Sequence, residues 1–181
     1  MRFMPVLLLA LALAVPARAA DFTLTSPDVA DGQPLSNREV YAGFGCAGEN
    51  RSPALRWANP PAGTKSFAVT VYDPDAPTGS GWWHWVVFNL PASVLALPAG
   101  AGGAAGGLPT EATQSRTDFG QPGFGGACPP VGDAPHRYVF TVHALDVERL
   151  DLPPDSPAAM VGFMLGQHRL GRAELTATYG R

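Results

Sequence analysis

Glycine and proline interrupt this chain too often for a fold built from long helices. The 181 residues include 21 glycines and 19 prolines. In a helix interior, glycine costs about 1 kcal/mol and proline about 3 kcal/mol relative to alanine. Charged residues, which usually coat the outside of a helical bundle, make up only 15% of the chain, against roughly 25% in a typical soluble domain. The sequence therefore disfavours a helical bundle and favours a loop-rich fold built on strands.

The chain has enough apolar residues for a core and no excess of positive charge. Hydrophobic residues make up 46% of the sequence, which suits one ordinary globular domain. The 15 acidic side chains outnumber the 12 basic ones. A nucleic-acid-binding surface needs a basic excess to neutralise phosphates, so we do not expect nucleic acid as a partner.

The first nineteen residues have the layout of a cleavable secretory signal peptide. Arg2 precedes an apolar run over 6–15, and Ala17-Arg18-Ala19 places small residues before a cleavage site. The apolar run is too short to span a bilayer, so we expect no transmembrane segment. No cysteine lies near the cleavage site, which argues against a lipid anchor. Cleavage after Ala19 would leave residues 20–181 as a single domain that is periplasmic or secreted.

Export changes the interpretation of the two cysteines. Cys46 and Cys128 lie in segments rich in glycine and proline, and in an oxidising compartment an even pair of cysteines favours a disulfide. A reactive thiol is the alternative, but the residues beside Cys128 include no charged group that would stabilise a thiolate. We therefore predict a disulfide between Cys46 and Cys128.

Four segments follow the period-two pattern of β-strands. They are rich in β-branched and aromatic residues, and prolines lie at several of their ends. Apolar residues occupy both alternating positions in the middle segments, which predicts a sheet that is covered on both faces. The predicted strands are Lys65–Tyr72, Trp82–Leu90, Arg137–Leu145 and Ala173–Tyr179.

One helix is expected, before the last predicted strand. Ser156 is a candidate N-cap, with Pro157 at the first helical position. Residues at three- and four-residue spacing predict a stripe that faces the sheet. This stripe consists of Met160, Phe163, Met164 and Gln167. The segment 99–107 contains only alanine and glycine, and we expect it to be a mobile loop.

Polar side chains gather where the predicted strands meet loops. They are Asp73 and Asp75 after the first strand, His84 in the second, and His136 with Arg137 at the start of the third. Pro74 and Pro77 fix φ in the first of these loops, so a pocket there would be preorganised. Each polar residue also has a structural interpretation: the aspartates as turn formers, His84 as a buried hydrogen-bonded side chain, and Arg137 as a surface charge.

Three blocks of the chain resemble, in order and spacing, the signature blocks of the phosphatidylethanolamine-binding proteins. These blocks are Asp73–Pro77, Trp82–Asn89 and Pro135–Phe140. The segments Phe44–Trp57 and Gly126–Pro130 resemble the bacterial Raf kinase inhibitor-like YbhB/YbcL branch of that family, in particular its exported members. The likeness runs from about Phe22 to Tyr179.

The resemblance implies a mainly β, sandwich-like fold with a large central antiparallel sheet, a smaller sheet and a few peripheral helices. It also implies a small surface pocket for an anion such as phosphate, acetate or a phospholipid head group, without a cofactor or a metal. By motif position, the pocket would be lined by Asp73, His84 and His136, with Pro74, Pro129, Pro130 and Tyr138 as walls. Arg137 would form a structural salt bridge.

The predicted pocket residues have a chemistry that suits a zwitterion. A carboxylate beside two imidazoles favours their protonated form, so we expect Asp73 to keep a proton on His84 or His136. A phosphate would then meet cationic N–H donors, while Asp73 could hold the amine of an ethanolamine head group. The segment Gln167–Arg169 departs from the smaller, neutral residues of the family pattern, so a pocket rim or partner surface there could differ.

Three other functions stay open on the sequence alone. Two histidines and one aspartate also compose a facial metal triad, as in a metal-dependent enzyme. A hydrolase needs an activated nucleophile, but Ser80 has no evident base and the chain has no Gly-x-Ser-x-Gly motif. A carbohydrate-binding module could stack sugars on Trp82, Trp83 and Trp85, although we expect Trp83 and Trp85 on opposite faces of their strand.

We interpret the chain as an exported binding protein that is not an enzyme. Its expected partners are a small anion or a phospholipid head group, and a protein that it inhibits or modulates, such as a kinase or a protease.

Overall fold

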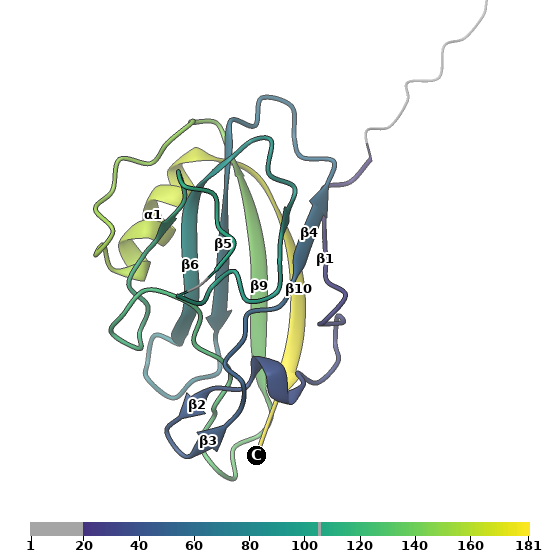
Figure 1. Cartoon of the computed structure of the whole chain (residues 1–181), viewed down its shortest axis with the longest axis vertical. Coiled ribbons are helices and arrows are strands. Elements are labelled where there is room, and N and C mark those ends of the chain that lie inside the picture. Colours follow the sequence, from purple (N-terminus) through teal and green to yellow (C-terminus); the bar gives the residue numbers. More distant parts are fainter. Residues whose placement is uncertain (1–19, 105) are drawn as a thin grey trace, which may run out of the picture.

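The computed structural model describes residues 20–104 and 106–181, so the predicted signal peptide lies outside the described residues. Figure 1 shows a large twisted sheet with helix α1 (Ala158–His168) packed on one side and shorter strands on the other. Among the helices of the described residues, none is long and apolar enough to cross a membrane.

The large sheet contains all four predicted strands. Its order is β10-β9-β5-β6-β8, and every neighbouring pair is antiparallel. Its strands are β5 (Ser66–Asp73), β6 (Trp82–Pro91), β8 (Thr113–Gln114), β9 (His136–Leu145) and β10 (Arg169–Tyr179). The main difference from the prediction is that β10 begins four residues before Ala173, where a register shift near Gly171 interrupts its pairing with β9.

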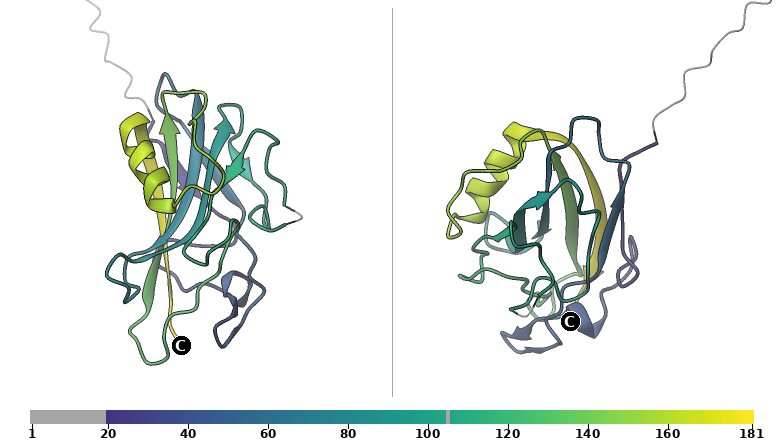
Figure 2. Two further views of the ribbon diagram at one scale, coloured as in Figure 1. Left: turned by 90° about the vertical axis from the view of Figure 1, so that its left-hand side faces the viewer. Right: turned by 45° about the horizontal axis from the view of Figure 1, so that its top comes forward.

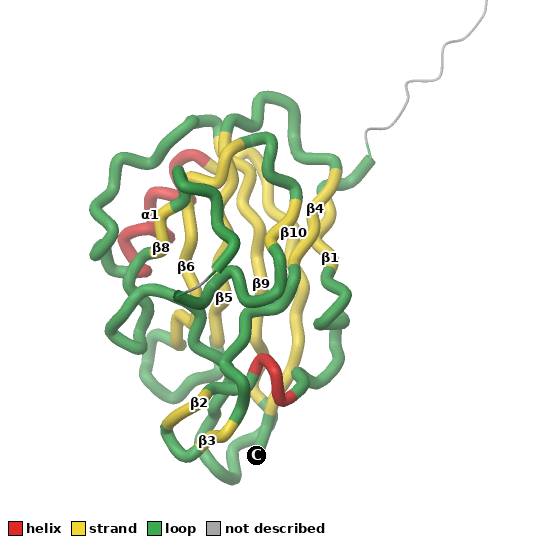
Figure 3. The backbone as a smooth tube through the Cα atoms, in the orientation of Figure 1, coloured by secondary structure: helices red, strands yellow, loops and turns green. Residues whose placement is uncertain are grey.

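Apart from α1, which corresponds to the expected helix, the remaining elements are short, which is why the sequence pattern did not reveal them (Figure 3). A second antiparallel sheet has the order β1-β4-β7, and β2 pairs with β3 in a small hairpin. These strands are β1 (Thr23–Thr25), β2 (Ala42–Gly43), β3 (Cys46–Ala47), β4 (Leu55–Ala58) and β7 (Ala96–Leu97). The helices are the 3₁₀-helix η1 (Asn37–Glu39) and α1 (Ala158–His168). The predicted mainly β, sandwich-like class is therefore confirmed.

The large sheet is buried on both faces, as the apolar pattern predicts. One face packs against the β1-β4-β7 sheet in the larger core, which includes Trp57, Phe67 and Phe140. The other face packs against α1 in a smaller core, which includes Phe88 and Val161. Figure 2 shows α1 on one side of the large sheet.

An extra residue in β6 controls which side chains face which core. Val71 of β5 lies opposite Trp85, whereas Tyr72 lies opposite Trp83, so His84 is the additional residue of a β-bulge. Simple alternation would place Trp83 and Trp85, two residues apart, on the same face. Because of the bulge, Trp85 lies in the larger core and Trp83 packs toward α1. The two rings therefore lie on opposite faces, as expected, but the bulge is the reason.

The buried side of α1 is not the predicted one. Pro157 is the N-cap, and no side chain within residues 20–104 and 106–181 caps the helix; the Ser156 carbonyl accepts a hydrogen bond from the Ser115 hydroxyl. Met160 and Phe163, from the predicted stripe, are 50% and 62% exposed. The buried residues are Ala158, Val161 and Leu165. The helix sequence is apolar on all sides, so periodicity alone does not select a face.

Residues 99–102 of the segment 99–107 are packed into the fold, contrary to the expectation of a mobile loop, whereas 103, 104, 106 and 107 are exposed. Ala101 is fully buried in the larger core. The Gly100 amide donates to the Ser52 carbonyl and the Gly102 amide to the Ser52 hydroxyl. A Cβ at Gly102 would lie 2.5 Å from Phe124, so the small residues here permit close packing.

Cys46 and Cys128 form the predicted disulfide, with their Cα atoms 6.0 Å apart. The bond joins β3 to the segment that enters β9. It links residues 82 positions apart in the sequence, so it closes a long loop in the unfolded chain.

We predict that the double variant Cys46→Ser, Cys128→Ser lowers the free energy of unfolding by about 4 kcal/mol, from the loop-closure entropy of the unfolded chain. Urea denaturation of the oxidised protein and the variant measures the difference. Reduction of the wild-type protein should reproduce the loss and leave the variant unchanged. Two alkylatable thiols in protein isolated under oxidising conditions would contradict the disulfide.

Candidate functional site

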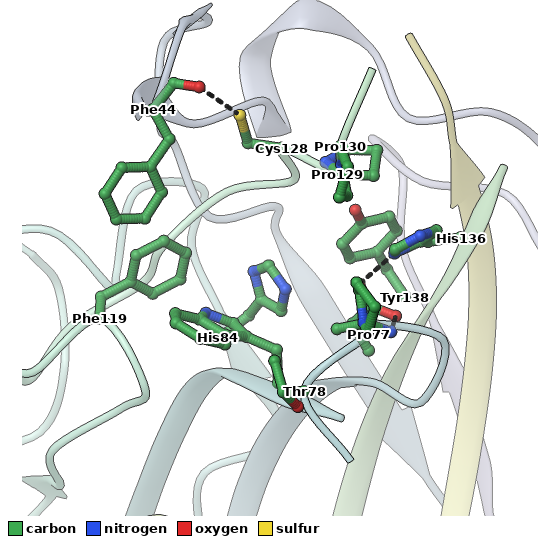
Figure 4. A pocket seen from close by; sticks show the side chains of 13 residues that line it. Phe44, Pro77, Thr78, His84, Phe119, Cys128, Pro129, Pro130, His136 and Tyr138 are labelled. Atoms are coloured by element: carbon green, nitrogen blue, oxygen red, sulfur yellow. Dashed lines mark hydrogen bonds and ion pairs between the residues drawn. The ribbon is translucent and has the colours of Figure 1, made fainter. Parts of the chain in front are cut away.

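A pocket of about 220 Å³ opens at the end of the large sheet where β5 ends and β6 and β9 begin. In Figure 4, Phe44, Phe119 and His84 lie on one side of it, and Pro129, Pro130, His136 and Tyr138 lie on the other. The structure brings together six of the seven residues predicted for a ligand site. They are Asp73, His84, Pro129, Pro130, His136 and Tyr138.

The seventh predicted residue, Pro74, lies elsewhere. It lines a hollow on the α1 side of the sheet, whereas Ala76, Pro77 and Thr78 from the same loop line the pocket. Successive residues of an extended segment point to opposite sides. With Asp73 facing the pocket, Pro74 therefore faces away from it.

Asp73 is the buried acid at the end of β5, and its carboxylate has three hydrogen-bond donors. Oδ1 accepts from the backbone amides of Asp75 at 2.8 Å and Ala76 at 3.0 Å. Oδ2 accepts from Nδ1 of His136 at 2.8 Å. Asp73 therefore fixes the loop after β5 and also binds the first residue of β9.

His136 lies between two carboxylates. Its Nδ1 donates to Asp73, and its Nε2 lies 3.4 Å from Oδ2 of Asp133. Burial lowers the pKa of His136, but the hydrogen bond and charge of Asp73, with those of Asp133, outweigh burial and raise this pKa above its ordinary value of 6.5. His136 therefore retains its proton to higher pH, which is the form that Asp73 was expected to favour.

His84 differs from that expectation. Its ring is almost completely buried, and burial lowers its pKa despite the charge of Asp73 and the hydrogen bond to Gly125. The Gly125 carbonyl, 2.7 Å from Nδ1, can only accept, so Nδ1 carries the hydrogen. The neutral ring therefore has an acceptor at Nε2. The expected donating form of His84 is not the form that this environment favours.

Tyr138 contributes a buried hydroxyl to the pocket wall. Its ring packs edge-on against His84, with ring centroids 5.1 Å apart. Within the described part of the chain, this hydroxyl has no hydrogen-bond partner. Burial raises the pKa of Tyr138, so the group keeps its hydrogen and can donate it.

Arg137 forms the structural salt bridge that was predicted for it. Its side chain faces away from the pocket and binds both carboxylate oxygens of Asp75, at 2.9 Å and 2.7 Å. The guanidinium lowers the pKa of Asp75 to about 2. This bidentate pair joins the loop after β5 to β9 from outside.

Sequence reasoning missed the aromatic part of the wall. Phe119 packs against Trp82 and His84, with both pairs of ring centroids 5.4 Å apart, and it stacks on Phe44. Phe44 and Phe119 lie in irregular segments, where no periodicity marks a residue as buried or functional. Trp82 pairs with Asp73 across β5 and β6 and lines the pocket.

Arg181 fastens two sides of the pocket mouth. Its Nε donates to the Pro129 carbonyl at 2.6 Å, and its Nη2 donates to the Phe44 carbonyl at 3.3 Å. The Cys46–Cys128 disulfide connects the same two segments covalently. The β2-β3 hairpin and the segment that contains Pro129 and Pro130 are therefore held at a fixed separation.

The comparisons with known proteins agree with this arrangement. Residues 25–180 match the sequence model of the family described as "Phosphatidylethanolamine-binding protein". The chain belongs to this family. YbcL of Escherichia coli is 55% identical over 90% of both chains, and YbhB of the same organism is 54% identical over 86% of this chain and 98% of its own. The family resemblance and its YbhB/YbcL branch are therefore confirmed.

Structural similarity supports the same assignment. The crystal structure of E. coli YbcL, described as a new member of the mammalian PEBP family, superposes with a TM-score of 0.87 over 90% of this chain and 99% of YbcL. LppC of Mycobacterium tuberculosis, a protein named as a lipoprotein, is 34% identical over 91% of this chain and 75% of its own.

The opposite environments of the two pocket histidines give a testable difference in titration. We predict that His136 titrates above, and His84 below, the ordinary imidazole pKa of 6.5. Histidine ring signals followed by NMR between pH 5 and pH 8, the range around the reference value, measure both. Asp73→Asn should lower the pKa of His136. Titration of both rings near 6.5 would contradict this account of the pocket.

The same shifts predict how folding depends on pH. The fold holds His84 and His143 neutral, so below about pH 6.5 the unfolded chain binds more protons and stability falls. The raised pKa of His136 changes stability in the opposite direction. Its contribution to the free energy of unfolding is complete below about pH 6.5, and it is lost as the pH rises through the pKa of His136 in the folded protein. Urea denaturation at pH 5, 6 and 7 should therefore show the lowest stability at pH 5.

Proposed function

We propose that this protein is an exported, non-enzymatic binding protein whose pocket takes a small phosphate-type anion, either free phosphate or a phospholipid head group. The observation that carries the proposal is the set of buried polar groups at the pocket. Tyr138 offers a hydroxyl that has no hydrogen-bond partner among the described residues, and His84 offers a ring nitrogen. Membership of a family named for phosphatidylethanolamine binding supports the same class of ligand.

The protonation states match a ligand that has both acceptor and donor atoms. The Tyr138 hydroxyl can donate to a phosphate oxygen, and protonated His136 supplies positive charge close by. Nε2 of neutral His84 can accept from a protonated phosphate oxygen or from an ammonium group. The Asp73 carboxylate is already hydrogen-bonded on both oxygens, so its part is to position His136 rather than to bind an amine directly.

Metal-dependent catalysis fits the pocket less well. Nδ1 of His136 faces Asp73 and its Nε2 faces Asp133, while Nδ1 of His84 faces a carbonyl. Across residues 20–104 and 106–181, no group of three or more His, Cys, Asp or Glu side chains could hold a metal ion. A sugar platform is also disfavoured, because Trp85 is fully buried and Trp83 faces the other side of the sheet.

Export and a protein partner belong to the proposal as well. The sequence of residues 1–19 and the likeness to LppC, named as a lipoprotein, support export. A role as an inhibitor or modulator of a kinase, a protease or another protein rests on the family resemblance alone. The pocket mouth, with exposed Phe44 and Val131 near it, is where we would look for such contact.

We predict that affinity for sulfate rises as pH falls from 8 to 5, because a larger fraction of His136 then carries a proton and its positive charge. Sulfate is the probe because phosphate takes up its own proton near pH 6. Isothermal titration calorimetry measures the affinity, and His136→Gln should weaken binding by about tenfold at pH 6, or about 1.4 kcal/mol. Thermal denaturation checks that the variant is folded, and exposed Asp155→Asn is the matched control. Affinity that stays constant across this range, or survives His136→Gln, would contradict the assignment.

We also predict that the purified protein folds without metal and contains none in stoichiometric amount. Elemental analysis by mass spectrometry measures the content, and addition of a chelator should not change the melting temperature. One iron or zinc per chain, lost in His84→Ala, would replace the binding proposal with the metalloenzyme.

A further inference from the structure

A second hollow lies on the other face of the large sheet, beside α1. It has a volume of about 260 Å³ and is lined by residues of β5, β6, β9, β10 and α1. The pocket described above opens on the opposite face, toward the larger core. The two share no lining residue among those described, so a ligand here would not occupy the anion pocket.

The floor of this hollow is polar and buried. Thr70, Thr141 and His143 are 4%, 6% and 7% exposed. Thr70 pairs with Thr141 across β5 and β9, and His143 pairs with Arg172 across β9 and β10. A sheet face that is covered by a helix is normally apolar, because buried polar groups cost free energy unless they are hydrogen-bonded.

His143 has a hydrogen-bonding group that the protein leaves unused. Its Nε2 lies 3.1 Å from the Thr70 hydroxyl. Its Nδ1 is buried and has no partner in the described part of the chain. Most buried side-chain polar atoms in proteins have at least one partner. Because His143 lines the hollow, a ligand atom there could supply that partner.

The rim of the hollow is cationic. Arg169 and Arg172 line it, together with Glu174. Nε of Arg172 binds Glu174 at 3.1 Å, whereas no ion pair joins Arg169 to another described residue. The three side chains leave one net positive charge, which matches a ligand with one negative charge. A guanidinium binds a carboxylate through two parallel hydrogen bonds, so a carboxylate is the favoured group.

The rest of the hollow's lining is apolar, and the hollow has free space beside α1. Trp83, Leu165 and Gly162 form this part of the lining. Trp83 also packs on Tyr72, with ring centroids 4.6 Å apart, so one edge of the hollow is a pair of aromatic rings. Gly162 has no side chain, and a Cβ there would lie in ordinary contact with Trp83 at 3.6 Å. A larger side chain at this position would extend into the hollow.

We propose that this hollow is a second ligand site, which binds a small monocarboxylate with a flat apolar body. Arg169 holds the carboxylate, the floor at Thr70 and His143 offers hydrogen bonds, and Trp83 and Leu165 contact the apolar body. Binding of a carboxylate at this site does not require the anion pocket.

The test is an NMR titration of the ¹⁵N-labelled protein with benzoate at pH 7, with benzyl alcohol as the uncharged analogue. We expect saturable shifts of the amides of Gly162, His143 and Arg169, and binding of benzyl alcohol at least about tenfold weaker. Arg169→Gln should weaken benzoate by about tenfold. Arg149→Gln, which removes an exposed arginine outside the hollow, should leave the affinity unchanged.

Two substitutions in α1 separate filling of the hollow from damage to the helix. Gly162→Leu should abolish benzoate binding by occupying the space. Gly166→Leu places the same side chain on the same helix, where a Cβ would meet no described atom within 4 Å, and should leave binding intact. Added phosphate should not displace benzoate.

Four results of the benzoate titrations would overturn the proposal, and a competition with phosphate could give a fifth. They are benzoate shifts that are absent or scattered over the surface, equal binding of benzyl alcohol, unchanged affinity in Arg169→Gln, and equal losses in the two glycine variants. Displacement of benzoate by phosphate would place benzoate in the anion pocket instead, and that too would overturn the second site.

Discussion

The pocket depends on the buried carboxylate of Asp73. A buried charge is tolerated only when it is paired and hydrogen-bonded, and both oxygens of Asp73 are satisfied, by two amides of the following loop and by His136. One side chain therefore fixes the end of β5, the turn after it and the first residue of β9. Loss of this carboxylate would leave His136 and two loop amides without their acceptor.

The second constraint is the β-bulge at His84. In a regular strand, a residue between Trp83 and Trp85 would face the opposite side from both. The extra residue places His84 beside Tyr138 at the pocket, while Trp85 remains in the larger core. Bulges commonly redirect side chains next to binding sites. The disulfide and Arg181 hold the two sides of the pocket mouth together, so the pocket is preformed.

The sequence was sufficient for the four long strands of the large sheet, though not for the two-residue strand β8, and for most of the polar residues that line the pocket, because long apolar segments and motif residues are local signals. It was not sufficient where the outcome depends on tertiary packing. The sequence of α1 is apolar on all sides, so it does not show which face is buried. Phe119 lies in an irregular segment, where no pattern in the neighbouring residues indicates that it lines the pocket. The low pKa of His84 follows from burial by segments far away in the sequence, which its nearness to Asp73 could not reveal.

The most direct test of the central claim is a crystal structure of the protein soaked with arsenate, a phosphate analogue whose anomalous scattering locates it. The account predicts an arsenic peak in the 220 Å³ pocket, with arsenate oxygens within hydrogen-bond reach of the Tyr138 hydroxyl and Nε2 of His84. A pocket that stays without arsenic, while arsenate binds at exposed arginines outside both hollows such as Arg149, would contradict it.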